Sequence, residues 1–185
     1  MRKMSTSTNQ PKPCKILIMG LDNSGKTSIL LSLRKDTNIL SYCSLRPTKG
    51  VDIKKYETPD LMMSVWDFGG QQQYRDGYLE KFSEYIDKVE KIIYVIDVQD
   101  VNRYDQAVNY LEQILNELKK YNVNVDFSVF LHKYDPNLSK LEKFEDIDQR
   151  VNSVLIEKLK AIIPSDITYD IFKTTIFTVF EKTSA

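Results

Sequence analysis

The sequence predicts an α/β fold in which helices cover both faces of a mostly parallel, six-stranded sheet. Short apolar runs alternate along the chain with longer segments whose apolar residues recur at helical spacing. One run, Lys91 to Val98, is apolar almost throughout, which is typical of a parallel strand covered on both faces. Ligands of such folds bind at the carboxyl ends of the strands, so functional residues are expected directly after strands.

The first part of the chain predicts a strand, a helix and a strand pair. Cys14 to Met19 is a short apolar run, and apolar residues within Thr27 to Leu33 predict the helix that follows. A polar segment, Asp36 to Gly50, then precedes two strands. These strands are expected at Val51 to Glu57 and Leu61 to Trp66, joined by a Thr-Pro-Asp turn.

The rest of the chain predicts helices that alternate with single strands. In order, the expected elements are a helix at Gln73 to Val89 behind a switch-like loop, a strand at Lys91 to Val98, a helix at Arg103 to Tyr121, a strand at Phe127 to Leu131, a helix at Ile147 to Leu159 and a strand at Tyr169 to Phe172. Pro164 lies beyond the last helix, where proline is common.

Composition favours one domain, expected at residues 14–185 after a flexible polar tail at residues 1–13. Lys plus Arg and Asp plus Glu each number 26, and the zero formal charge argues against a nucleic-acid binder. Cys14 and Cys43 lack zinc-site or disulfide-framework spacing, so we expect a cytoplasmic, reducing location. No apolar run approaches the roughly 20 residues of a membrane span, and Arg2 excludes myristoylation. Membranes are therefore expected to be reached only through partners.

The segment Gly20 to Ser28, Gly-Leu-Asp-Asn-Ser-Gly-Lys-Thr-Ser, predicts a phosphate-binding loop between a strand and a helix. Its glycines permit a tight turn from which backbone N–H groups point at phosphates, while Lys26 adds a charge and Thr27 offers an oxygen to Mg²⁺. The side chain of Asp22 is expected near the γ-phosphate. The expected nucleotide-binding residues here are Asp22, Asn23, Ser24, Gly25, Lys26, Thr27 and Ser28.

Two further motifs are expected at the same phosphates. In Trp-Asp-Phe-Gly-Gly-Gln, Asp67 can hold a water on Mg²⁺, the N–H of Gly70 can sense the γ-phosphate, and Gln71 can orient the attacking water. In Arg-Pro-Thr-Lys-Gly, Thr48 can supply a second oxygen to Mg²⁺ when the triphosphate is bound. The alternatives are structural: Asp67 as a turn cap, Gly69 and Gly70 as a tight bend, and Thr48 in an ordinary Pro-Thr turn.

A fourth motif, His-Lys-Tyr-Asp, predicts recognition of guanine. Asp135 can accept hydrogen bonds from N1–H and the exocyclic amine of guanine, a donor pair that adenine lacks. Lys133 would lie along the base, and His132 is expected to brace this loop against the phosphate loop. After the last strand, Thr175 and Ile176 can present backbone N–H groups to the base O6; the alternative is Thr183-Ser184-Ala185.

In this order the motifs resemble those of the Ras superfamily of small GTPases, from Lys15 to about Phe177. The phosphate loop, Pro-Thr-x-Gly and Trp-Asp-x-Gly-Gly-Gln are similar to the Arf branch. His-Lys-x-Asp, Ile-Ile-Tyr-Val-Ile-Asp-Val-Gln-Asp and Phe-Lys-Thr-Thr-Ile-Phe are similar to the Rag/Gtr branch, which we favour. The polar start differs from the lipidated helix of Arf proteins. Only about ten residues follow Thr175, so we expect either a chain truncated at the last helix or a minimal relative without the Rag-type dimerisation domain.

The resemblance implies a P-loop G domain that binds GTP and GDP with Mg²⁺ and hydrolyses GTP. Hydrolysis is expected to be slow because the chain offers no obvious arginine finger; Arg46 and Arg75 are expected to be partner contacts or solvated charges. Exchange factor, activating protein and effector would bind residues 40–50 and 68–85, and a dimer through the G domain stays open. Tyr74, Tyr78 and Phe82 form an aromatic face for either a partner or the core. The alternatives are a nucleotide-locked scaffold that lacks hydrolysis and, disfavoured by Asp135, an adenylate-using P-loop enzyme.

Overall fold

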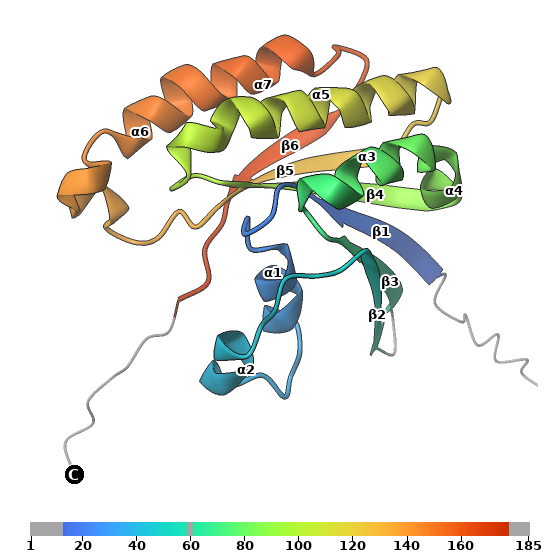
Figure 1. The fold of residues 1–185 in the computed structure, drawn as a ribbon, viewed down its shortest axis with the longest axis horizontal. Coiled ribbons are helices and arrows are strands. Elements are labelled where there is room, and N and C mark those ends of the chain that lie inside the picture. The colour runs from blue at the N-terminus through green and yellow to red at the C-terminus, as the bar shows by residue number, and fades with distance from the viewer. Residues whose placement is uncertain (1–12, 59–60, 178–185) are drawn as a thin grey trace, which may run out of the picture.

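The six predicted strands form one sheet in the order β2-β3-β1-β4-β5-β6 (Figure 1). A computed structural model describes residues 13–58 and 61–177. Within them the strands are β1 (Pro13–Met19), β2 (Val51–Thr58), β3 (Leu61–Phe68), β4 (Val89–Asp97), β5 (Asp126–His132) and β6 (Tyr169–Lys173). β2 and β3 pair antiparallel and the other neighbours pair parallel, which confirms the predicted fold class.

Helices lie on both faces of this sheet (Figure 1). One face carries α1 (Lys26–Ser32), with α2 (Ile39–Cys43) beyond it. The helices of the other face are α3 (Gln72–Glu80), α4 (Phe82–Ile86), α5 (Tyr104–Lys120), α6 (Ile147–Arg150) and α7 (Ile156–Ile162). Short 3-10 turns occur at η1 (Val101–Arg103), η2 (Leu138–Lys140) and η3 (Glu142–Phe144).

The structure corrects two predicted helices and adds one helix that was not predicted. The helix expected at Gln73 to Val89 is α3 followed by α4, and the left-handed backbone of Lys88 (φ 56°) separates α4 from β4. The segment expected to be merely polar contains α2, whose first turn is closed by a capping box between Asn38 and Ser41. The long helix expected near Ile147 contains a π-helical segment, η4 (Val151–Leu155), between α6 and α7.

Some sequence-based expectations lie outside the described residues. They concern residues 1–12 of the expected tail, residues 59–60 of the Thr-Pro-Asp turn and residues 183–185, the alternative base-contacting segment.

The hydrophobic core has a large part between the sheet and α3–α7 and a smaller part beneath α1. Tyr78 and Phe82 belong to the large part and are almost fully buried, with Tyr78 packed edge-to-face on Phe68. The predicted aromatic face of the switch helix is therefore mainly a packing surface in this structure. Arg75 is also buried, against the ring of Tyr110, so it is not a solvated charge.

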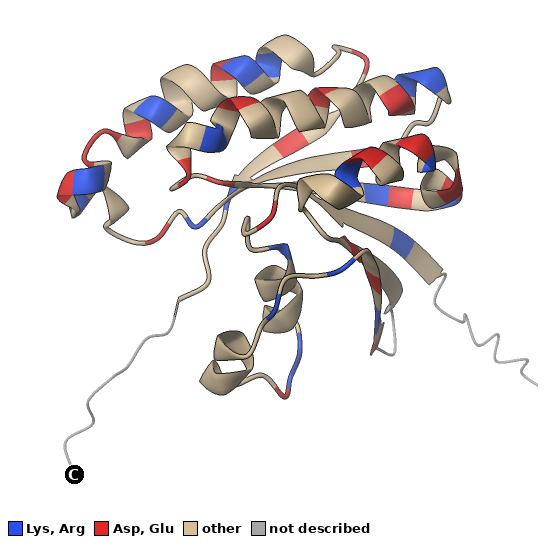
Figure 2. Cartoon of the chain, viewed as in Figure 1, with Lys and Arg blue, Asp and Glu red and all other residues tan. Residues whose placement is uncertain are grey.

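Surface charge is mixed in sign. Figure 2 shows acidic and basic residues interspersed along α5, α6 and α7. Among the described residues, no helix has the length and apolar character that a membrane span requires.

Candidate nucleotide-binding site

The predicted phosphate loop links the carboxyl end of β1 to the first turn of α1. Gly20 (φ 142°), Asn23 (φ 58°) and Gly25 (φ 94°) have positive φ angles, which glycine adopts at little cost and asparagine tolerates. The loop lines a cleft of about 430 Å³ together with residues 45–48 and 68–71. Three segments predicted separately from the sequence therefore meet around one space.

Lys26 lies at the base of this cleft and is buried. Its Nζ donates hydrogen bonds to the carbonyl oxygens of Gly20 (3.0 Å) and Leu21 (2.6 Å). Desolvation lowers the pKa of Lys26 to about 8, against the opposing attraction of Asp67 and Asp22. A phosphate in the cleft would favour the charged ammonium for the same electrostatic reason.

The three predicted Mg²⁺ ligands converge. Oδ2 of Asp67 accepts hydrogen bonds from the hydroxyls of Thr27 (2.6 Å) and Thr48 (3.3 Å), which lie 3.0 Å from each other. Oδ1 of Asp67 is buried and has no hydrogen-bond partner, and burial raises the pKa of this carboxyl group. Two hydroxyls and a carboxylate with an unpaired oxygen suit a hard cation that takes its remaining ligands from phosphate and water. Nowhere in the described residues do three His, Cys, Asp or Glu side chains form an alternative metal cluster.

The segment that follows β3 lines this cleft with Gly69, Gly70 and Gln71. The N–H of Gly69 donates to the carbonyl of Gly50 (2.9 Å), and Gly70 packs against the backbone of Leu21 and Asp22. Gln71 lines the cleft, and its Oε1 is buried without a hydrogen-bond partner. The geometry thus brings Gln71 to the expected place, while its action on a water molecule stays a prediction.

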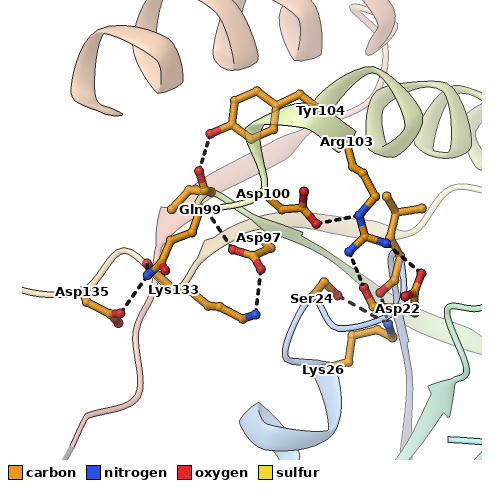
Figure 3. A network of polar contacts seen from close by, with 12 residues as sticks. Asp22, Ser24, Lys26, Asp97, Gln99, Asp100, Arg103, Tyr104, Lys133 and Asp135 are labelled. Carbon is orange, nitrogen blue, oxygen red and sulfur yellow. Dashed lines mark hydrogen bonds and ion pairs between the residues drawn. The ribbon is translucent and has the colours of Figure 1, made fainter. Parts of the chain in front are cut away.

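Asp22 lines the cleft, and it has an ion-pair partner that the sequence did not predict. Its carboxylate lies 2.9 Å from Nη1 of Arg103, and Nη2 of Arg103 donates to its main-chain carbonyl (3.2 Å). Nε of Arg103 also donates to Asp100 (2.5 Å), as Figure 3 shows. The charge expected near the γ-phosphate is thus paired with a residue that follows β4, one that sequence reasoning missed.

The predicted base-recognition loop follows β5. Oδ1 of Asp135 accepts a hydrogen bond from the hydroxyl of Thr175, and Nζ of Lys133 donates to Asp97 (2.7 Å). A second cleft, of about 350 Å³, opens between this loop and α2. Its lining residues are Gly25, Ser28, Ile39, Tyr42, His132, Lys133, Asp135, Ile176 and Phe177.

Sequence reasoning missed the contribution of Ile39 and Tyr42 to this second cleft. The capping residues Asn38 and Ser41 were the available signal for a helix there.

His132 joins the two loops. The position that a side-chain carbon on Gly25 would occupy is 2.4 Å from Cδ2 of His132, so the imidazole packs directly on the phosphate loop. Its Nδ1 lies 3.0 Å from the hydroxyl of Thr174. Burial, followed by the positive charge of Lys133, lowers the pKa of His132 below its usual value. These contacts agree with the expected bracing role.

Comparison with known proteins gives matches of three kinds: a family model, relatives in sequence and a solved structure. The family model of the Gtr1/RagA G protein conserved region matches residues 15–183. ADP-ribosylation factor-like protein 3 of Caenorhabditis elegans is 34% identical over 143 residues, which cover 77% of this chain and 71% of the relative. ADP-ribosylation factor-like protein 2 of Dictyostelium discoideum is 31% identical, with 75% and 72% covered. A solved structure of the Arl6 BBS3 small GTPase from Trypanosoma brucei, with bound nucleotide analogue GppNp, has a similar fold (TM-score 0.61, 22% identity, 89% and 87% covered).

Proposed function

We propose that this chain is a switch that binds GTP and GDP with Mg²⁺ and slowly hydrolyses GTP. The chain belongs to the Ras superfamily of small GTPases and shares features with its Gtr1/RagA and ADP-ribosylation factor branches. The convergence of Thr27, Thr48 and Asp67 beside the phosphate loop is the observation that carries this proposal. Thr48 and Asp67 belong to separate segments of the chain, so a ligand that all three share would order both segments.

The residues of the cleft have complementary tasks in this proposal. Lys26 and the N–H groups at the start of α1 hold the phosphates. Bound through Thr27, Thr48 and Asp67, Mg²⁺ would neutralise charge on the phosphates. Gln71 orients the attacking water, and Gly70 contacts the γ-phosphate through its N–H.

Slow turnover is expected because two of the three arginines near the site are held by contacts elsewhere. Arg103 is held by Asp22 and Asp100, and Arg75 is buried against Tyr110. Arg46 lines the cleft but is exposed to solvent. An activating partner that donates an arginine would accelerate hydrolysis by about 10³- to 10⁵-fold. Partners are proposed to bind residues 40–50 and 68–85 of a cytoplasmic protein, which reaches membranes through them.

The base preference has a direct test. The nucleotide that copurifies with the full chain would be released and identified by chromatography. We expect guanine nucleotide, because Asp135 matches the two N–H donors of guanine. Recovery of adenine nucleotide would overturn the assignment.

A nucleotide-locked scaffold is the alternative function. Single-turnover hydrolysis of GTP would be compared among the wild type, Gln71→Leu and Gln73→Leu, a control at an exposed position of α3. The switch requires that Gln71→Leu be much slower than both other proteins. Absence of hydrolysis in all three would favour the scaffold, whereas equal and measurable rates would count against a water-positioning role for Gln71.

A further inference from the structure

The segment between β4 and α5 contacts both ends of the candidate site (Figure 3). Arg103 lies at its phosphate end and holds Asp22. Gln99 lies at its base end and contacts Lys133 and Asp135, two of the residues expected to recognise the base. Gln99 therefore joins the loop after β4 to the loop after β5.

Both side-chain N–H groups of Gln99 can be accounted for. Nε2 lies 2.8 Å from the carbonyl oxygen of Lys133 and 2.8 Å from Oδ2 of Asp135. Because an amide nitrogen has two N–H donors and the two partners are acceptors, this pairing fixes which way the carboxamide faces. The main-chain N–H of Gln99 donates to Asp97 (2.9 Å), whose other oxygen accepts from Nζ of Lys133 (2.7 Å). The contacts form a closed ring.

The ring includes a strained residue. Lys133 has a left-handed backbone (φ 61°), a conformation that costs free energy for any residue with a side chain. Its carbonyl is one of the two groups that Gln99 holds. Since Asp135 follows two residues later, a change in the backbone of Lys133 would redirect the carboxylate of Asp135.

The carboxylate of Asp135 is held from two sides. Gln99 donates to Oδ2, and the hydroxyl of Thr175 donates to Oδ1. Each carboxylate oxygen can accept a second hydrogen bond, so both remain able to accept from a base. Two donors on different oxygens restrict rotation of the carboxylate and present it as a fixed pair of acceptors.

We propose that Gln99 is a positioning residue for guanine recognition, which holds the carboxylate of Asp135 so that it accepts the two N–H donors of the base. The inference rests on the proposed function, since it presumes that a guanine nucleotide occupies the site. A glutamine is suited to this task because it donates to a carboxylate and a carbonyl together, which neither glutamate nor an apolar residue can do.

The test compares GDP with inosine diphosphate, which lacks the exocyclic amine. Dissociation constants would be measured on the full chain for the wild type, Gln99→Met, Gln99→Glu and Asn102→Ala. Methionine keeps the length of the side chain and removes the donors, whereas glutamate adds a charge of the same sign as Asp135. Asn102 is an exposed control on the same segment.

The exocyclic amine of guanine would donate one hydrogen bond to the charged carboxylate of Asp135. We therefore expect the wild type to bind GDP about 10- to 100-fold more tightly than inosine diphosphate. In Gln99→Met we expect GDP affinity to fall about tenfold and inosine diphosphate affinity to fall less, so the preference shrinks at least about threefold. Gln99→Glu should lose more GDP affinity than Gln99→Met, and Asn102→Ala should match the wild type.

Two results would overturn the inference alone: equal weakening of both nucleotides in Gln99→Met, or wild-type GDP affinity in Gln99→Glu. Failure of the wild type to bind either nucleotide would instead overturn the proposed function, and the inference with it.

Discussion

Replacement of Gly70 by alanine offers a sharp test of how the cleft is built. A side-chain carbon at this position would lie 2.1 Å from the main-chain nitrogen of Asp22 and 2.2 Å from the carbonyl carbon of Leu21. These are backbone atoms of the phosphate loop, which cannot rotate aside as a side chain can. The backbone of Gly70 itself is not left-handed, so the cost of Gly70→Ala comes from contact and not from an unfavourable φ.

The size of the displacement follows from the geometry. Carbon atoms in ordinary contact are about 3.5–4.0 Å apart, so the phosphate loop and the Gly70 segment must separate by roughly 1.5 Å. Loss of one hydrogen bond to a charged phosphate costs about 1.5–3 kcal/mol. We therefore expect Gly70→Ala to weaken binding of a non-hydrolysable GTP analogue by about 10- to 100-fold relative to GDP.

Gly77 provides the matched control in the same segment. It is exposed within α3, and a side-chain carbon there would have no heavy atom within 4 Å. Gly77→Ala should stabilise the protein by up to about 1 kcal/mol through helix propensity and leave both affinities unchanged.

Fluorescence titration with both nucleotides, together with the thermal midpoint of each variant, measures these effects. A folded Gly70→Ala protein with the wild-type ratio of GTP-analogue to GDP affinity would refute the reasoning.

Two further predictions concern stability. The unfolded chain protonates His132 near its usual pKa of 6.5, whereas the folded protein protonates it only at lower pH, so stability should fall as pH drops below about 6.5. In thermal unfolding at pH 7.5 and 5.5, the His132→Asn variant should lose less stability than the wild type; equal losses would contradict this. Arg75→Met should raise the thermal midpoint by about 2–4 °C, because it removes a buried guanidinium whose Nε has no partner, whereas Arg75→Ala should lower it by leaving a cavity. A decrease in both would show that the cation contributes to stability.

The strands and the main motifs could be predicted because their signals are local. An apolar run such as that of β4 predicts a strand without knowledge of its neighbours, and the phosphate loop is a continuous segment. The end of α4 was harder to predict, because it depends on the left-handed backbone of Lys88. No glycine or proline lies there to indicate a turn. The π-helical segment at Val151–Leu155 keeps the apolar pattern of an ordinary helix, so periodicity alone did not reveal it.

The supporting residues of the site could not be predicted because their partners are distant in sequence. Gln99 meets Asp135 across 36 positions, and Arg103 meets Asp22 across 81. No local pattern records such pairs, which arise when parallel strands bring their carboxyl ends to one edge of the sheet. Tyr42 was missed for a related reason, since its contribution depends on where α2 lies against the loop after β5.

The ion pair between Arg103 and Asp22 connects the phosphate loop to the start of α5. Arg103 immediately precedes this 17-residue helix, which is about 25 Å long. Its two hydrogen bonds to Asp22 therefore link the phosphate loop to the N-terminal end of the helix. The C-terminal end of α5, at Lys119, borders a separate cleft of about 250 Å³, which lies at the opposite end of the helix from Asp22. A shift of α5 along its axis would therefore either carry Asp22 with it or break the ion pair.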